Sequence, residues 1–168
     1  METVVVNDTN IFIDLLSINL LDEFFRLPII IHTNDFIINE LSEPEQQQKV
    51  LSYSPGRLYI KRYSAPELAE IAAFHATCEN NVSFQDCSVW LYAQQNSYRL
   101  LTGDGKLRKS ASASGTTVSG ILFIFDLMVN SSIISPEMGY QKLEELSVVN
   151  KRLPSEEIRK RLLKWRRD

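Results

Sequence analysis

Two short stretches of the chain decide its fold: Val4-Val5-Val6-Asn7-Asp8 near the N-terminus and Arg99-Leu100-Leu101-Thr102-Gly103-Asp104 in the second half. Each contains a short apolar run typical of a buried strand, ends at an aspartate and is followed by helical spacing. Strands that alternate with helices predict a parallel sheet covered by helices. Ligands bind such sheets beyond the carboxyl ends of the strands, so we expect Asp8 and Asp104 to lie on the same rim.

The rest of the chain continues this alternation. Further strands are expected at residues 28–31, 58–60 and 115–118. Helices are expected at residues 11–25 with a break near Asn19, and at 36–41, 46–53, 67–78, 83–95, 105–114, 121–129, 136–146 and 154–166. We therefore predict an α/β fold, a three-layer α/β/α sandwich with a central, mostly parallel sheet and a helical C-terminal tail. Residues 1–135 would form the core, and residues 136–168 a helical extension packed on the same domain.

The composition is that of an ordinary soluble protein, with 44% apolar and 23% charged residues in a chain of 168. Cys78 and Cys87 do not suggest a disulfide scaffold, and no zinc-type spacing of cysteine and histidine is present. The N-terminus lacks the features of a signal peptide, and the most apolar stretch, 121–129, is too short to span a bilayer. We therefore expect a cytoplasmic protein with free thiols and no membrane segment.

Charge is unevenly distributed along the chain. The net charge is -3, but residues 151–168 hold eight basic and three acidic residues, so the remainder carries -8. This asymmetry suits an acidic site that holds cations, with a basic appendage that reaches toward phosphate or an acidic partner. Ile158, Leu162 and Trp165 have near-helical spacing within this basic tail. A packed amphipathic helix and a docking surface for RNA or a partner protein both remain open.

Each acid of interest also has a simple structural interpretation. Asp8 and Asp104 could cap the helices that follow them, and Glu40 could lie on a solvated helix face. Asp86 stands three residues after Ser83, as in a capping box. Capping does not predict, however, that several acids fall on one rim. Two carboxylates about 5 Å apart repel by roughly 3 kcal/mol at an effective dielectric near 20, so a cluster of them favours a divalent cation.

The ordered set of these motifs resembles the PIN domain family. It comprises Val6-Asn7-Asp8-Thr9-Asn10, Asn39-Glu40-Leu41, Ser83-Phe84-Gln85-Asp86 and Leu101-Thr102-Gly103-Asp104-Gly105-Lys106-Leu107-Arg108, of which Thr-Gly-Asp is the most specific part. PIN domains are small metal-dependent ribonucleases, and many bacterial members, VapC-like, are toxins paired with an antitoxin. The resemblance covers about residues 3–135, and the tail is similar to the helical tail of one prokaryotic PIN subgroup.

The resemblance implies which residues would form the site. Asp8, Glu40, Asp86 and Asp104 would be the catalytic acids. Asp8 and Asp86 would bind Mg²⁺ or Mn²⁺ directly, and Glu40 and Asp104 would act through metal-bound water or a second ion. The hydrogen bonds of three further side chains would support these ligands: Thr9, Asn10 and Ser83.

The basic residues after Asp104 have two interpretations. Lys106, Arg108 and Lys109 could contact RNA phosphates near the cut, or they could form a solvated helix face. The segment Gly103-Asp104-Gly105-Lys106 is not a phosphate-binding P-loop, because its glycine spacing is wrong and no Lys-Ser/Thr pair follows.

The leading hypothesis is a single-domain, metal-dependent endoribonuclease that leaves a 5′-phosphate, as the family implies. It would be the toxin of a toxin–antitoxin pair, with RNA as its substrate, an antitoxin protein as a partner and a homodimer as its assembly. One alternative is a catalytically idle PIN-like module that binds RNA or protein. Another is a phosphatase with Asp8 as nucleophile, which is weakened because Asn10 stands where that chemistry would want a second acid.

Overall fold

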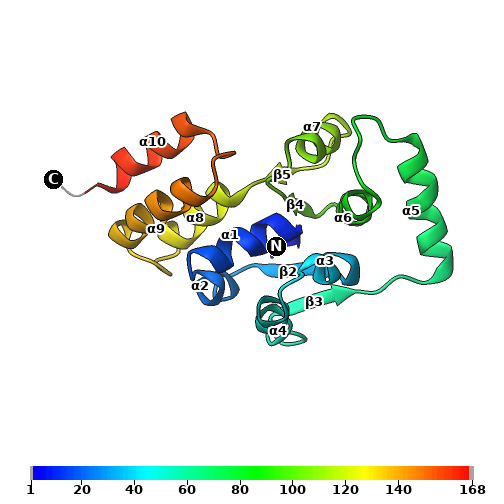
Figure 1. Ribbon diagram of the computed structural model, residues 1–168, viewed down its shortest axis with the longest axis horizontal. Helices are drawn as coiled ribbons and strands as arrows, with labels where there is room; N and C mark the ends of the chain where they lie inside the picture. The colour runs from blue at the N-terminus through cyan, green and yellow to red at the C-terminus, as the bar shows by residue number, and fades with distance from the viewer. Residues whose placement is uncertain (1, 167–168) are drawn as a thin grey trace.

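The computed structural model describes residues 2–166 and shows five strands in one sheet (Figure 1). All neighbouring strands pair in parallel, in the order β3-β2-β1-β4-β5. Their bounds are β1 Val4–Asn7, β2 Ile30–Asn34, β3 Leu58–Lys61, β4 Arg99–Leu101 and β5 Val118–Ser119. The predicted parallel α/β sheet is therefore confirmed. All five carboxyl ends point to one edge, and β1 lies at the centre of that edge.

Helices cover both faces of the sheet. They are α1 Thr9–Ser17, α2 Leu21–Phe25, α3 Asp35–Glu40, α4 Pro44–Leu51, α5 Ala65–Thr77, α6 Phe84–Asn96, α7 Gly105–Ala113, α8 Ile121–Asn130, α9 Pro136–Val149 and α10 Ser155–Trp165. Helix α6 packs against β1, β2 and β4, and α5 packs against α6. Figure 1 shows α5 and α6 on the right, whereas α8, α9 and α10 lie on the left. Within residues 2–166, no helix combines the length and the apolar character needed to cross a membrane.

The break predicted near Asn19 is present. Helix α1 ends at Ser17, α2 begins at Leu21, and Asn19 between them has φ 55°. Asparagine tolerates this left-handed conformation better than most residues, so the chain can turn here at low cost.

The second strand lies later than predicted. We expected it at residues 28–31, but β2 runs from Ile30 to Asn34. Pro28 has no N–H to donate, and the N–H of Ile29 bonds to the carbonyl of Leu27 rather than to the sheet. The N–H of Ile30 is the first to reach β1, at the carbonyl of Thr3. The last strand also lies later, because Gly115 makes a turn with φ 88° before it.

The C-terminal helices pack onto the core. Trp165 of α10 is 3% exposed, and its ring stacks near Phe125 of α8 with the centroids 6.3 Å apart. A Cβ on Gly139 of α9 would lie 2.9 Å from Val129 and 3.3 Å from the Trp165 ring, so only glycine fits at this crossing. Ile158 and Trp165 of α10 are buried, so this helix packs through its apolar side, which is one of the two interpretations left open by the sequence. The division into residues 1–135 and 136–168 stays a prediction, and Arg167 and Asp168 lie outside the described residues.

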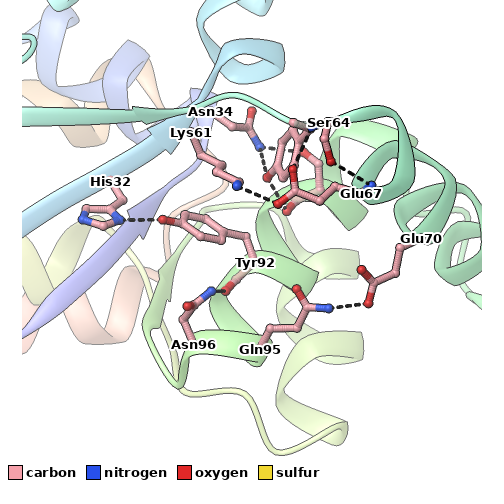
Figure 2. Close-up of polar contacts among 11 residues, drawn as sticks. His32, Asn34, Lys61, Ser64, Glu67, Glu70, Tyr92, Gln95 and Asn96 are labelled. Carbon is pink, nitrogen blue, oxygen red and sulfur yellow. Dashed lines mark hydrogen bonds and ion pairs between the residues drawn. The ribbon is translucent and has the colours of Figure 1, made fainter.

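Polar contacts tie α5 and α6 to β2 and β3 (Figure 2). The Nδ1 of His32 lies 2.8 Å from the hydroxyl of Tyr92 on α6. The side chain of Asn34, also on β2, donates a hydrogen bond of 2.8 Å to the hydroxyl of Ser88. These bonds explain how polar residues at the end of β2 can be buried without an energetic penalty.

Candidate active site at the carboxyl ends of the strands

Asp8 lies at the centre of the candidate site. It directly follows β1, is 4% exposed and caps the N-terminus of α1. Its Oδ1 accepts a 2.8 Å hydrogen bond from the N–H of Thr9, and its Oδ2 accepts one of 2.7 Å from the hydroxyl of Thr102. The amide of Asn10 lies 3.3 Å from the same Oδ2. The capping interpretation of Asp8 is therefore confirmed, and the carboxylate is held in one orientation.

The surroundings of Asp8 disfavour its negative charge. Burial raises the pKa of Asp8 to about 7, against the hydrogen bonds from Thr102 and Thr9, which lower it. The charges of Asp86 and Glu40 raise the pKa further. Both of these charges therefore oppose the ionisation of Asp8. In residues 2–166, no lysine or arginine forms an ion pair with Asp8.

Glu40 joins this group through Thr9. It is the last residue of α3, and its Oε2 accepts a 2.6 Å hydrogen bond from the hydroxyl of Thr9. The N–H of Thr9 bonds to Asp8, so one residue connects the two carboxylates. Glu40 is exposed, as expected for a solvated helix face, but its side chain is fixed toward β1.

Asp86 is held by a capping box at the start of α6. The N–H of Ser83 donates to Asp86 Oδ2 at 2.9 Å, and the N–H of Asp86 donates to the Ser83 hydroxyl at 3.0 Å. The capping box predicted for this pair is confirmed. The other carboxylate oxygen, Oδ1, accepts no hydrogen bond from any described residue, so it stays available to a ligand.

Asp104 caps α7 beyond the end of β4. Its Oδ1 accepts a 2.8 Å bond from the N–H of Leu107, which confirms the capping interpretation. The N–H of Asp104 donates to the hydroxyl of Thr102 at 3.1 Å, and the same hydroxyl donates to Asp8. Nearby, Asn10 accepts a 2.8 Å bond from the N–H of Gly103. The loop after β4 is therefore fastened to the start of α1.

Thr102 was not expected among the site residues. Its hydroxyl stands between Asp8 and Asp104, where it donates to one and accepts from the other. The signal in the sequence was its place as the first residue of the Thr-Gly-Asp motif, of which only the aspartate had a predicted role.

Hydrogen bonds through Thr9 and Thr102 link Asp8, Glu40 and Asp104, whereas Asp86 bonds with Ser83 and acts on Asp8 through its charge. Among the described residues, no group of three or more histidine, cysteine, aspartate or glutamate side chains is arranged to hold a metal ion. A cap N–H occupies one oxygen of each of Asp8, Asp86 and Asp104. A carboxylate can accept at both oxygens, so free acceptor positions remain for a cation. The donor set is all oxygen and lacks a counter-charge, and it therefore fits a hard divalent ion.

Comparison with known families decides the assignment of the fold. The sequence model of a family described as DUF3368, a PIN domain, matches residues 4–167. The chain belongs to the PIN domain family. PIN domains are typically metal-dependent nucleases that use divalent ions. The match extends through α9 and α10, the tail that the sequence likened to the helical tail of one prokaryotic PIN subgroup.

The chain is also similar to several solved structures at low sequence identity. PAE2754 from Pyrobaculum aerophilum aligns over 76% of this chain and 98% of its own, with 16% identity and a TM-score of 0.50. VapBC2 from Rickettsia felis, solved bound to a DNA fragment from their promoter, aligns over 70% and 98%, with 17% identity and a TM-score of 0.42. FitAcB from Neisseria gonorrhoeae aligns over 68% and 95%, with 17% identity and a TM-score of 0.43. No curated protein matches the sequence.

A fifth acid of this PIN domain was overlooked. Asp35 directly follows β2, as Asp8 follows β1, and both are preceded by an asparagine, Asn34 and Asn7. One buried oxygen of Asp35 and one of Asn7 have no hydrogen-bond partner among the described residues. The repeated Asn-Asp pair was the available signal. It went unnoticed because the second strand was placed before its true position.

The basic residues after Asp104 are exposed on α7. A Cβ on Gly120 would lie 2.7 Å from a guanidinium nitrogen of Arg108, so the arginine lies across that glycine. Lys106 and Lys109 form no ion pair with any described residue. The position of Arg108 beside the β5–α8 connection distinguishes it from these two lysines.

Proposed function

We propose that this PIN domain is a Mg²⁺- or Mn²⁺-dependent endoribonuclease that hydrolyses RNA phosphodiester bonds in the cytoplasm. The observation that supports the proposal is the set of carboxylates around Asp8. A buried acid that two neighbouring acids repel is costly unless a cation offsets the charge. Nucleases gain from the same arrangement, because a cation at this place also neutralises the phosphate that is cut.

Each acid would have a defined task. A bound divalent ion would neutralise the scissile phosphate and supply a water molecule of lowered pKa. Asp8 and Asp86 would hold that ion, and Glu40 and Asp104 would orient water around it. Hydrolysis would place the oxygen of water on the 5′-phosphate and a proton on the leaving 3′-oxygen. Thr9, Asn10, Ser83 and Thr102 would keep the carboxylates in position through the hydrogen bonds described above.

The sharpest test uses two capping boxes of the same chain. Ser64 and Glu67 at the start of α5 form the same reciprocal bonds as Ser83 and Asp86, but Glu67 pairs with Lys61 at 2.7 Å. Asp86→Asn should abolish Mn²⁺-dependent cleavage of an RNA mixture, because it removes a charge from the acid cluster. Glu67→Gln should leave cleavage intact. EDTA should stop the wild-type reaction, and circular dichroism should show that both variants are folded. Full activity of Asp86→Asn would refute the assignment of this acid.

We also propose that the nuclease is the toxin of a toxin–antitoxin pair, and that it acts as a homodimer. Membership of the PIN family supports this extension. Expression in bacteria should arrest growth, Asp86→Asn should not, and co-expression of a small adjacent reading frame should relieve the arrest. Light scattering would report the assembly. Growth that continues with active, well-expressed wild-type protein would contradict the toxin role.

A catalytically idle PIN-like binding module is the second candidate. The absence of an assembled metal-binding group among the described residues favours it. If the folded wild type cuts no RNA with any divalent metal, this candidate replaces the first.

A further inference from the structure

A groove beside the acid site has no role in the proposal so far. Its volume is about 890 Å³, and it is lined by α1, by the loops that follow β4 and β5, and by the α9–α10 connection. One end reaches Asn10 and Gly103. Asn10 also contacts Asp8, at 3.3 Å, so the groove opens directly beside the central carboxylate.

Cations without a partner line this groove. Arg108, Lys151 and Arg152 are exposed there, and none of them forms an ion pair with a described residue. Arg161 also lines the groove, but it is neutralised by Asp126 at 2.6 Å and Glu157 at 3.2 Å. The three unpaired cations can therefore bind an anion without first breaking an existing contact.

Apolar side chains lie between these cations. Ile13 of α1 is 45% exposed and Val149 of α9 is 61% exposed, and both line the groove. Phe123 of α8 lines it as well. Unpaired bases can pack on exposed apolar and aromatic surfaces, whereas the bases of a duplex are already stacked on one another. The combination of cations and apolar surface therefore favours a single strand.

The segment that carries two of the cations is held in place. The amide of Asn150 donates to both oxygens of Asp14 on α1, at 3.0 and 3.1 Å. The Oδ1 of Asn150 accepts a 3.0 Å bond from the N–H of Arg152. The width of the groove is therefore fixed before a ligand binds, which lowers the entropic cost of binding.

We propose that this groove binds the backbone of single-stranded RNA and leads it to the acid site. Arg108, Lys151 and Arg152 contact its phosphates. The inference that the groove leads RNA to the acid site rests on the proposed nuclease function. RNA binding by the groove can be measured without cleavage. It also assigns a role to the basic tail. The sequence left open whether this tail binds RNA or a partner protein.

The test is a charge-matched pair of double variants. Lys151→Gln/Arg152→Gln removes two cations from the groove. Arg26→Gln/Lys49→Gln removes two exposed cations outside the groove, one directly after α2 and one on α4. Binding of a short, fluorescently labelled, single-stranded RNA is measured by anisotropy in EDTA over a series of salt concentrations. Thermal unfolding verifies that both variants are folded.

The groove variant should bind RNA roughly tenfold more weakly, and its plot of log affinity against log salt should flatten by about 1 per lost contact. The control should bind like the wild type. Equal losses in both variants, an unchanged groove variant, absence of binding by the wild type, or equal affinity for an RNA duplex would each overturn the inference.

Cleavage in Mn²⁺ separates this inference from the nuclease proposal. A wild type that cuts RNA, with a groove variant that binds and cuts equally well, refutes the groove and leaves the nuclease standing. A wild type that binds through the groove without cutting supports the groove and refutes the nuclease.

Discussion

Asp8 and Asp14 are both buried carboxylates of helix α1, Asp8 at its N-terminal cap and Asp14 in its middle, but they have different neighbours. Asp14 faces the α9–α10 connection, where the amide of Asn150 donates to both of its oxygens. Burial raises its pKa to about 6, and no other acid contributes to the shift. Asp8 faces the rim of the sheet, where burial and the charges of Asp86 and Glu40 raise its pKa to about 7.

The difference teaches which buried acids indicate a site. Burial alone raises the pKa of a carboxyl group. Asp14 is such a case, because it is buried where it accepts hydrogen bonds from Asn150 and holds two segments together. Asp8 also bonds to a distant segment through Thr102, but the like charges of Asp86 and Glu40 oppose its ionisation, and a structural contact does not explain why those charges are there. Asp8 is therefore a candidate for catalysis, and Asp14 is a candidate for holding the extension in place.

The largest expected difference between the two is in catalysis. Asp8→Asn should lower RNA cleavage by about a thousandfold or more, since a lost metal ligand removes several kcal/mol of transition-state stabilisation. Asp14→Asn should change cleavage by less than about tenfold. Single-turnover rates with excess enzyme measure both. Equal losses would show that the two acids do not differ in the way described.

The second-largest difference between Asp8 and Asp14 should be their effect on metal binding. Mn²⁺ at a hundred times its dissociation constant should raise the free energy of unfolding by about 2.7 kcal/mol. The increase should disappear in Asp8→Asn and persist in Asp14→Asn. Thermal melts with and without Mn²⁺ report it. A melting temperature that Mn²⁺ raises equally in all three proteins would place the ion elsewhere.

The hydroxyl of Thr102 should have a smaller effect than either acid. Thr102→Val keeps the shape of the side chain but removes the donor to Asp8 and the acceptor for the N–H of Asp104. Losing such a supporting bond typically costs about 10- to 100-fold in metal affinity or activity. Thr77→Val, at the exposed end of α5, is the matched control and should cut RNA normally.

The smallest expected difference between Asp8 and Asp14 is in how each affects the pH dependence of stability. Both acids have a folded-state pKa above the ordinary value of 3.8, so the folded protein binds more protons than the unfolded chain between the two values. Without metal, the free energy of unfolding should therefore fall as the pH rises through this window. Asp14→Asn should flatten the curve up to about pH 6, and Asp8→Asn up to about pH 7. Urea titrations measure it, and curves that coincide with the wild type would contradict the shifts.

Much of the fold followed from local sequence. A short β-branched run marked β1, a short apolar run marked β4, and Asn19 marked the turn between α1 and α2. The error at β2 has a physical cause, because only Ile30 and Ile31 of the apolar run are paired, and the other paired residues are His32, Thr33 and Asn34. Such polar residues can be buried because backbone and side-chain groups distant in sequence bond to them, and periodicity does not report those partners.

The sequence predicted the acids of the candidate site but not the hydrogen bonds that link them. Strand ends and the order of the motifs pointed to Asp8, Glu40, Asp86 and Asp104. Thr102 could not be chosen from its neighbours, because its role exists only where the ends of β1 and β4 meet. Capping and site roles were treated as alternatives in the sequence, yet Asp8 caps a helix and also lies within the acid group.

Three helices begin at these acids: α1 at Asp8, α6 near Asp86 and α7 at Asp104. The N-terminus of a helix carries about half a positive elementary charge, so the carboxylates mask an underlying positive field. Replacing all three acids with asparagine would unmask it and reverse the preference of the rim from cations to phosphate. Such a protein would bind the RNA substrate without cleaving it.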